Sequence, residues 1–205
     1  MHFLLGAPNG TGGSKLGGNY APTFGPIMKA KKAGYALTLH LDAKTHSNID
    51  EFSTSNFVAL TYPGKFLLFI LFLHDILYSN KKKQSVVDAN GVRTFVTPDS
   101  NSILRSVTRL SLEDIATKLG WKVEERAVAL KEVEEGKFEE VAACGTAAII
   151  TPVKKIVRGD QTILIGSGEQ SEIGEGFKKL YDEYRGIQGG DIDDTFGWMW
   201  PEEGL

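Results

Sequence analysis

The stretch "NGTGGSKLGGNYAP" (residues 9–22) sets one lysine, Lys15, among five glycines, and Tyr20 follows it closely. Glycine permits positive φ and a close approach of the backbone, so a glycine-rich loop of this kind usually positions a polar group. An unprotonated lysine amine held in such a loop is a nucleophile toward an aldehyde. A Walker phosphate loop is excluded, because Leu16 follows Lys15 where that motif requires Ser or Thr. A solvated lysine in a flexible surface loop is the alternative that this stretch alone leaves open.

Three other short stretches carry groups that could act together with Lys15. They are "DEFSTSN" with Glu51 and Thr54, the helix start "SVTR" with Val107 and Thr108, and the turn "CGTA" with Gly145, Thr146 and Ala147. Each has an ordinary explanation by itself: a solvated loop carboxylate, a helix cap, and a tight turn before a core strand. As a set with Lys15, they indicate a site for a phosphate-bearing cofactor that requires a nucleophilic lysine and a carboxylate.

The elements that must position these groups follow from the apolar periodicity. The stretch "TFGPIMKAKKAGY" has apolar residues at near-helical spacing, which predicts an amphipathic helix that ends at Gly34. Alternation in "YALTLHLD" predicts a strand, and "IDEFSTSNFVALTYP" predicts a polar loop followed by a second strand. The stretch "SILRSVTRLSLEDIATKLGW" predicts a helix that Ser106 or Thr108 caps and that Gly120 ends.

The C-terminal half of the sequence predicts further strands and helices. We expect a strand in "KVEERAVAL", a short acidic helix in "KEVEEGKFEEV" and another strand in "QTILIG". In "AACGTAAIITPVKKI" we expect a buried strand that runs from a turn of small residues. The stretch "GEGFKKLYDEYRGIQGGD" predicts a helix with Phe177, Leu180, Tyr181 and Tyr184 facing inward. Strands with segregated helices favour an α+β fold, and residues 1–205 are interpreted as a single domain.

Residues 64–84 differ in composition from both flanks. The stretch "GKFLLFILFLHDILYSNKKKQ" is a dense run of Phe, Leu and Ile that ends in three lysines. Its apolar core, residues 66–73, is far shorter than the roughly 20 residues that a membrane-spanning helix needs. The composition therefore predicts an atypical inserted segment. Without it, "VALTYP" and "VVDANGVRTFVTPD" would form a hairpin that turns at Asn90 and Gly91.

The composition argues against several classes of protein and site. A net charge of −3, from 23 basic and 26 acidic residues, gives no electrostatic reason to expect nucleic acid or an anionic membrane as a partner. With one cysteine, Cys144, the chain has no intrachain disulfide framework and no multi-cysteine zinc motif. The four histidines lack metal-ligand spacing, so no metal site is expected. No targeting segment is recognised, and the expected location is cytoplasmic or mitochondrial.

The motifs and their order closely resemble those of branched-chain amino acid aminotransferases, which are pyridoxal 5'-phosphate (PLP) enzymes of fold type IV. The resemblance is carried by "GTGGSKLGGNYAP", "LTLHLD", "IDEFSTSNF", "SILRSVTRLS", "GWKVEERAV" and "AACGTAAIITPV". It covers about residues 7–188, apart from residues 64–84. It implies the large C-terminal cofactor domain of such enzymes. That domain has a D-amino acid aminotransferase-like α+β fold, with a mixed sheet or pseudo-barrel and flanking helices.

The resemblance also implies a role for each candidate residue. Those matched to the cofactor are Lys15, Tyr20, Glu51, Val107, Thr108 and Thr146, and those matched to the substrate carboxylate are Thr54, Gly145, Thr146 and Ala147. Lys15 corresponds to the lysine that forms the Schiff base with PLP and later shuttles a proton. Glu51 corresponds to the carboxylate that keeps the pyridine nitrogen protonated, so that the ring can accept electrons. The helix start corresponds to the phosphate site, where a helix N-terminus favours an anion.

The relatives imply branched-chain amino acids and 2-oxo acids as substrates, 2-oxoglutarate as the amino acceptor, and a homodimer as the assembly. They also carry a smaller N-terminal domain that completes the pocket, and this sequence is expected to lack it. Three functions stay open at this point. The first is a branched-chain transaminase, and the second is a PLP-binding domain or fragment without activity. The third is another fold-type IV reaction, such as that of a D-amino acid aminotransferase or of a lyase acting on aminodeoxychorismate.

Overall fold

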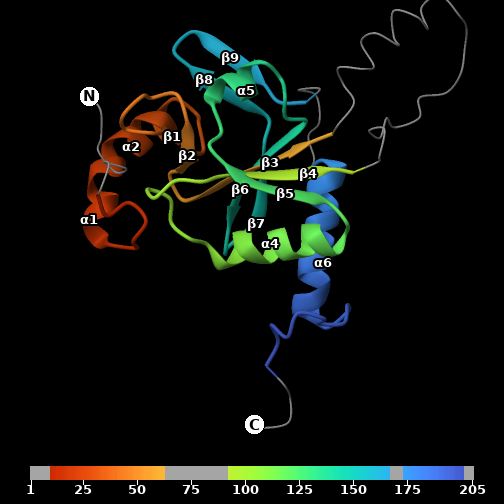
Figure 1. Ribbon diagram of the computed structural model, residues 1–205. Coiled ribbons are helices and arrows are strands. Elements are labelled where there is room, and N and C mark those ends of the chain that lie inside the picture. Colours follow the sequence, from red (N-terminus) through yellow and green to blue (C-terminus); the bar gives the residue numbers. More distant parts are fainter. Residues whose placement is uncertain (1–9, 63–91, 167–172, 201–205) are drawn as a thin grey trace, which may run out of the picture.

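The computed structural model describes residues 10–62, 92–166 and 173–200, and its centre is a mixed sheet (Figure 1). The strands of that sheet are β1 (Leu39–Leu41), β2 (Ile49–Phe52), β3 (Ser55–Thr61), β4 (Thr94–Pro98), β5 (Lys122–Arg126), β6 (Glu140–Gly145) and β7 (Ile149–Val153). A separate hairpin pairs β8 (Lys155–Arg158) with β9 (Gln161–Leu164). The helices are α1 (Gly17–Tyr20), the 3-10 turn η1 (Ala21–Thr23), α2 (Phe24–Lys32), α4 (Val107–Lys118), α5 (Leu130–Glu134) and α6 (Glu175–Gly189). The α+β fold expected from the sequence is confirmed.

Strand β3 is the centre of the sheet and has neighbours along both of its edges. Strand β6 runs antiparallel to it, with Asn56 opposite Cys144 and Leu60 opposite Glu140. On its other edge, β2 pairs with the beginning of β3 and β4 pairs with its end. Strands β4 and β5 are parallel and are joined through α4, as a parallel pair requires a crossover connection. Within the described residues the sheet stays open, so it is the mixed sheet, and not a closed barrel, that the structure shows.

The core lies on both faces of this sheet, because alternate residues of the two central strands point in opposite directions. On one face, Phe57 and Ala59 of β3 join Phe138 and the β8–β9 hairpin. On the other, Val58 and Leu60 pack against the helices. A strand that is buried on both faces reads as a nearly continuous apolar run, as "FVAL" does here.

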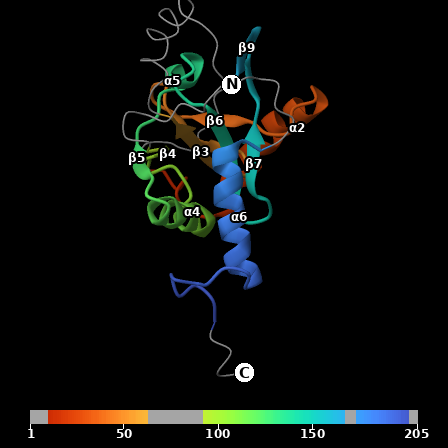
Figure 2. The ribbon, with the colours of Figure 1, turned by 90° about the vertical axis from the view of Figure 1, so that its right-hand side faces the viewer.

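Helices α4 and α6 cover one face of the sheet and lie side by side (Figures 1 and 2). Leu112 and Ile115 of α4 and Phe177 and Leu180 of α6 are buried there, as the helical spacing predicts. Tyr181 and Tyr184 were also expected to face inward, and they pack against the same cluster while remaining partly exposed. None of the described helices is long and apolar enough to cross a membrane.

The helix boundaries agree with the caps seen in the sequence. Gly34 and Gly120 follow α2 and α4 with φ of 85° and 75°, the left-handed conformation that ends a helix. Of the two candidate caps for α4, the structure uses Ser106, whose side chain accepts a hydrogen bond from the amide of Arg109. Thr108 lies inside the first turn instead.

Two predicted elements were wrong in extent. Residues 49–52 were expected to be loop but form β2, because a tight turn at residues 53–54 pairs them directly with β3. In residues 142–156 the chain reverses after Gly145, where the sequence predicts a turn of small residues. The residues before this turn are not part of the turn but the end of another strand, β6, and the strand predicted after it is divided between β7 and the start of β8. Ile149 takes a left-handed φ of 60° as β7 begins, a conformation that a β-branched residue rarely adopts.

The predicted insertion at residues 64–84 and the turn at Asn90 and Gly91 lie outside the described residues. The two flanking segments do pair as an antiparallel β3–β4 ladder, with Ala59 opposite Val96. This pairing agrees with the hairpin inferred from the sequence flanking the insertion.

Candidate active site

Glu51 lies on β2 with its side chain partly buried, which is not the solvated loop position that an isolated glutamate usually takes. Its neighbours Asp50 and Phe52 are buried. Burial raises the pKa of Glu51 to about 7, a hydrogen bond from the backbone of Leu104 lowers it, and the negative charge of Asp50 raises it. A carboxyl group with a pKa near neutrality can exchange a proton with a bound group at physiological pH.

Asn56, opposite Glu51 in the β2–β3 ladder, connects this carboxylate to the segment before α4. Its side-chain amide nitrogen lies 3.3 Å from Glu51 Oε2 and 2.9 Å from the carbonyl oxygen of Leu104. Asn56 is 4% exposed, so these acceptors replace water for a buried amide. Glu51, Asn56 and Leu104 therefore form one buried polar group at the edge of β2 and β3.

The helix start that follows Leu104 has the features of an anion site. The first-turn amides of a helix lack intrahelical acceptors, and the helix dipole favours negative charge there. The first turn of α4 holds no acidic residue, and Val107 is 78% exposed, whereas Thr108 is 2% exposed. The end of the helix is thus accessible through Val107, while the Thr108 side chain is enclosed by the fold.

Arg109 anchors this helix start to the sheet. Its Nη1 atom lies 2.7 Å from Glu113 Oε1 and 3.0 Å from Glu125 Oε1, which ties the first turn of α4 to β5. Arg109 is 5% exposed, so its charge is buried. Removing one partner of a buried ion pair destabilises the fold, because the other charge stays buried without a partner. Arg109 does not stand out in the sequence as a buried group, because an arginine on a helix usually lies in solvent.

The turn between β6 and β7 lies against the turn between β2 and β3. A Cβ atom on Gly145 would stand 3.4 Å from Ser55 Cβ and 3.8 Å from the carbonyl oxygen of Thr54. The structure thus brings Thr54 and Gly145 close together. Thr146 and Ala147 are exposed at the tip of the turn. Cys144, one residue earlier, is buried, and burial raises the pKa of its thiol to about 12, so it is not a nucleophile.

Lys15 lies in an exposed loop that is fixed from within and docked at Gly13. The side-chain amide of Asn19 donates to the carbonyl oxygens of Thr11 and Ser14, at 2.7 and 2.8 Å. A Cβ atom on Gly13 would stand 2.8 Å from the carbonyl oxygen of Asn101, so the loop backbone rests on the segment that leads to Leu104. The glycines around Lys15 therefore include one whose missing side chain permits this docking.

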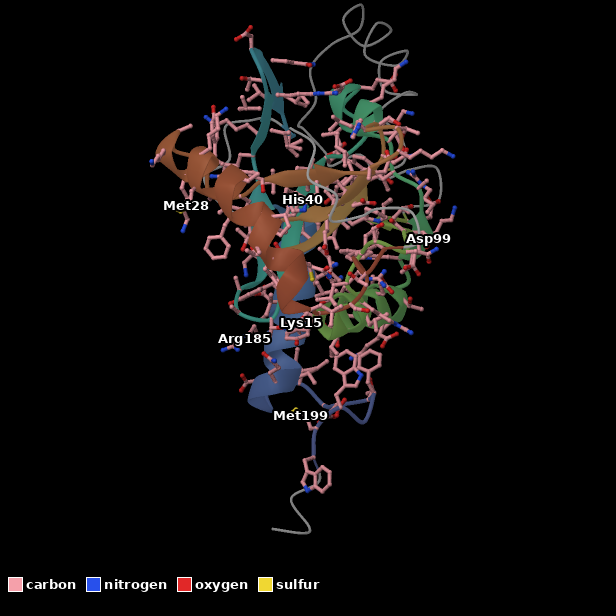
Figure 3. All side chains as sticks on the ribbon, turned by 90° about the vertical axis from the view of Figure 1, so that its left-hand side faces the viewer. Lys15, Met28, His40, Asp99, Arg185 and Met199 are labelled. Carbon is pink, nitrogen blue, oxygen red and sulfur yellow. The ribbon has the colours of Figure 1, made fainter. Side chains whose placement is uncertain are left out.

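Tyr20 ends α1 and is partly exposed, five residues beyond Lys15. Figure 3 shows Lys15 on the segment that leads into α1, with Met28 farther along on α2. The candidate residues thus fall into three connected groups: the lysine loop, the β2–β3 edge with its facing turn, and the start of α4. Residues 101–104 connect these groups. They contact the lysine loop at Gly13, accept a hydrogen bond from Asn56 at the β2–β3 edge, and lead directly into the start of α4.

The family model for class IV aminotransferases matches residues 14–156, and the chain belongs to this family. An aminotransferase of Emericella nidulans, atnJ, is 39% identical over 195 residues, which cover 94% of this chain and 49% of that protein. The branched-chain-amino-acid aminotransferase of Haemophilus influenzae is 36% identical over 199 residues, covering 94% of this chain and 48% of that protein. The chain spans about half the length of the curated relatives that it matches.

Solved structures agree with this assignment. The branched-chain amino acid aminotransferase of Escherichia coli superposes with a TM-score of 0.68 at 26% identity, over 94% of this chain and 50% of that one. The branched-chain amino acid aminotransferase of Thermoproteus uzoniensis, solved with norvaline, gives a TM-score of 0.63 at 21% identity, over 93% and 50%. A further branched-chain amino acid aminotransferase, solved in complex with N-(5'-phosphopyridoxyl)-L-glutamate, gives a TM-score of 0.68 at 24% identity, over 94% and 51%. The chain therefore has the fold of type IV aminotransferases, and membership of a PLP-using family implies PLP as its cofactor.

Proposed function

We propose that this chain is the cofactor-binding part of a PLP-dependent aminotransferase that moves an amino group from leucine, isoleucine or valine to 2-oxoglutarate. Lys15 is the residue that forms the Schiff base in this proposal. The observation that carries it is the arrangement around residues 101–104: a partly buried carboxylate, an accessible helix start without acidic residues, and an exposed lysine on a loop docked to the same segment. The names of several relatives support the choice of branched-chain amino acids.

The residues present fit the charges of PLP. Its phosphate needs amide donors, which the first turn of α4 supplies, and its ring nitrogen needs a carboxylate, which Glu51 supplies. When bound, PLP provides the electron sink for removing a proton next to the amino group.

The side chains of Lys15, Glu51 and Tyr20 have the other roles in the reaction. Lys15 holds the cofactor and, once released from it, its amine carries the proton between the substrate carbon and the cofactor. Glu51 shares a proton with the ring nitrogen and is held for this by Asn56 and Leu104. Tyr20 contacts the phenolic oxygen of the ring in this proposal.

The turns around the site hold the two anionic groups. In this proposal Val107 and Thr146, which are both exposed, contact the phosphate, and the enclosed Thr108 contributes its backbone amide in the first turn of α4. The β2–β3 and β6–β7 turns, through Thr54, Gly145, Thr146 and Ala147, bind the substrate carboxylate. Their mutual contact at Gly145 and Thr54 supports this assignment.

We also propose that the chain works as a homodimer. Four apolar side chains, Leu16, Tyr20, Phe24 and Met28, recur every fourth residue along the lysine loop, α1 and α2 and are exposed by 43 to 66%. An exposed apolar stripe of this kind is typical of an association surface. Light scattering on the purified chain tests the assembly: a dimer mass supports the proposal, and a monomer at micromolar concentration contradicts it.

The function is tested by borohydride reduction of the 205-residue chain with added PLP, followed by peptide mass spectrometry. We expect a reduced phosphopyridoxyl group on Lys15, none on that peptide in Lys15→Ala, and the parental result in Lys29→Ala, which removes another exposed lysine nearby. Amino transfer from leucine to 2-oxoglutarate is then measured for the same three proteins. Labelling spread over many lysines would contradict the site, and turnover of D-alanine without leucine would contradict the substrate class.

A further inference from the structure

Asn56 is a buried amide placed between two acceptors that belong to different parts of the site. One is the carboxylate of Glu51, and the other is the carbonyl of Leu104, two residues before the cap of α4. Both are acceptors, so the NH2 end of the amide must face them, and each of its two hydrogens has a partner. Among neutral side chains, the carboxamide of Asn or Gln is the one that carries two hydrogens on a single nitrogen and can join two acceptors in this way.

The position of Asn56 in the sheet makes this connection rigid. Its backbone lies in β3 between Glu51 of β2 and Cys144 of β6, so strands fix it on both edges. Its neighbours Phe57 and Val58 are fully buried on opposite faces. The backbone of Asn56 is therefore fixed, and its amide reaches Glu51 and Leu104 from a rigid position in the sheet.

We propose that Asn56 is a positioning residue that holds the Glu51 carboxylate and the start of α4 in one fixed arrangement, and that its amide favours the charged form of this carboxylate for the cofactor ring. This proposal rests on the function proposed above and adds a residue to it. Without Asn56, Glu51 keeps its burial and its bond from Leu104 but loses a side-chain donor. A donor to the charged form of an acid favours that form, so its removal makes the acid harder to ionise.

The first test is an NMR titration of the Glu51 side-chain carboxyl in the chain without PLP. Asn56→Ser removes the bridging amide without adding charge, and Asn56→Asp keeps the shape but removes both donors. We expect the Glu51 titration midpoint to rise by about one pH unit in Asn56→Ser, as follows from losing one hydrogen bond to a charged group. We expect a larger rise in Asn56→Asp, where a second acid lies beside the first.

Thr97→Val is the matched control. Thr97 is 1% exposed on β4, and its hydroxyl donates to the carbonyl oxygen of Phe57, the residue after Asn56, at 3.2 Å. The substitution removes a buried hydrogen bond to the same strand but leaves Glu51 its partners. It should lower the melting temperature and leave the Glu51 midpoint unchanged. If Thr97→Val moves the midpoint as far as Asn56→Ser does, or if Asn56→Ser leaves it in place, the proposal is overturned.

The second test measures PLP affinity from about pH 6 to about pH 9 by quenching of protein fluorescence. If Asn56 favours the charged form of Glu51, Asn56→Ser weakens binding several-fold near neutral pH and less at the alkaline end, where Glu51 is ionised in either protein. A loss of affinity that is equal at all pH values indicates a purely structural role and contradicts the proposal. The titration needs no cofactor, so it stays informative if the chain does not bind PLP, and the two proposals can therefore fail separately.

Discussion

Residues 49–56 and residues 10–20 contribute to the same candidate site, but they are held by different interactions. Glu51 and Asn56 lie on paired strands at the edge of the main core, and their side chains are bonded to each other and to Leu104. The lysine loop is exposed, and its order comes from the Asn19 side chain and from backbone bonds within the loop. Gly13 of this loop lies close to the backbone of Asn101 and Ile103.

The difference indicates that the two regions depend on the stability of the whole domain to different degrees. The carboxylate region is assembled when the sheet folds, because its ladder bonds and its core are the same ones that stabilise the domain. The lysine region depends on local bonds, which contribute less and open more easily. We expect substitutions in the first region to change the stability of the whole chain, and substitutions in the second to change Lys15 while leaving the fold intact.

The largest effect on stability is expected from Arg109→Met. It leaves Glu113 without its buried partner at the start of α4, and breaking a buried pair in this way costs about 3–5 kcal/mol of unfolding free energy. Urea denaturation monitored by circular dichroism gives the value. The double variant Arg109→Met with Glu113→Leu removes the unpaired acid and should recover most of the loss. A loss below about 1 kcal/mol in the single variant would show that the pair is not what anchors α4.

The carboxylate region also predicts a pH effect on folding. The pKa of Glu51 is about 7 in the folded chain and 4.5 in an unperturbed glutamate, mainly because burial disfavours the charge. The folded state therefore holds this proton more tightly. The stability it contributes is complete below pH 4.5 and is lost as the pH rises through 7. Relative to Glu51→Gln, the parent should lose on the order of 2–3 kcal/mol between pH 4.5 and about pH 8.

Denaturation curves of both proteins across that pH range measure this difference. Asp50 and Glu113 also have raised pKa values, chiefly through burial, and contribute a slope of the same sign. They are present in both proteins, so the difference between the two curves isolates Glu51. Parallel curves would mean that Glu51 is solvated in the folded chain.

Much of this site could be predicted from sequence, and the reasons differ between its parts. The helix at residues 107–118 and its end at Gly120 follow from local rules that act within a few residues. The anion site at its start follows from the same rules. Lys15 and Glu51 stood out through the resemblance to a family, since neither a lone lysine nor a lone glutamate is informative by itself.

The parts that were missed depend on contacts distant in sequence. Asn56 reads as one polar residue before an apolar run, and its partner Leu104 lies 48 residues farther along. The division of residues 142–156 into several strands depends on a left-handed Ile149, which is buried in the core, where packing offsets its conformational cost. The feature of the sequence that could have identified Asn56 is its position directly before the apolar run "FVAL", which belongs to a strand buried on both faces.

Gly13→Ala tests the docking of the lysine loop on residues 101–103. Its new Cβ would stand 2.8 Å from the carbonyl oxygen of Asn101, so one of the two backbones must move. We expect the docked position of the loop to be destabilised by about 1–3 kcal/mol, the usual range for overpacking, while the core stays folded. The amount of borohydride-trapped cofactor on Lys15 should fall strongly. Gly18→Ala is the matched control, because nothing lies within 4 Å of a Cβ there, and it should behave like the parent. Equal trapping in all three proteins would show that the docking does not position Lys15.

The smallest change in stability, and the sharpest test of the comparison, is expected from Asn19→Ala. The substitution removes the bonds to Thr11 and Ser14 that order the loop, but their exposure limits the cost to below about 1 kcal/mol. Hydrogen exchange should nevertheless become faster at the amides of Ser14 and Leu16, because their acceptors lie in the loop that Asn19 holds.

Trapping of PLP on Lys15 in Asn19→Ala should fall several-fold, while the melting temperature stays near that of the parent. Gln188→Ala is the control, since it removes an exposed side-chain bond from Arg185 on α6, away from the loop. Unchanged exchange at Ser14 and Leu16 would contradict a loop that is ordered from within. A large fall in melting temperature would contradict the difference proposed between the lysine loop and residues 49–56, because the lysine loop would then be part of the cooperative core.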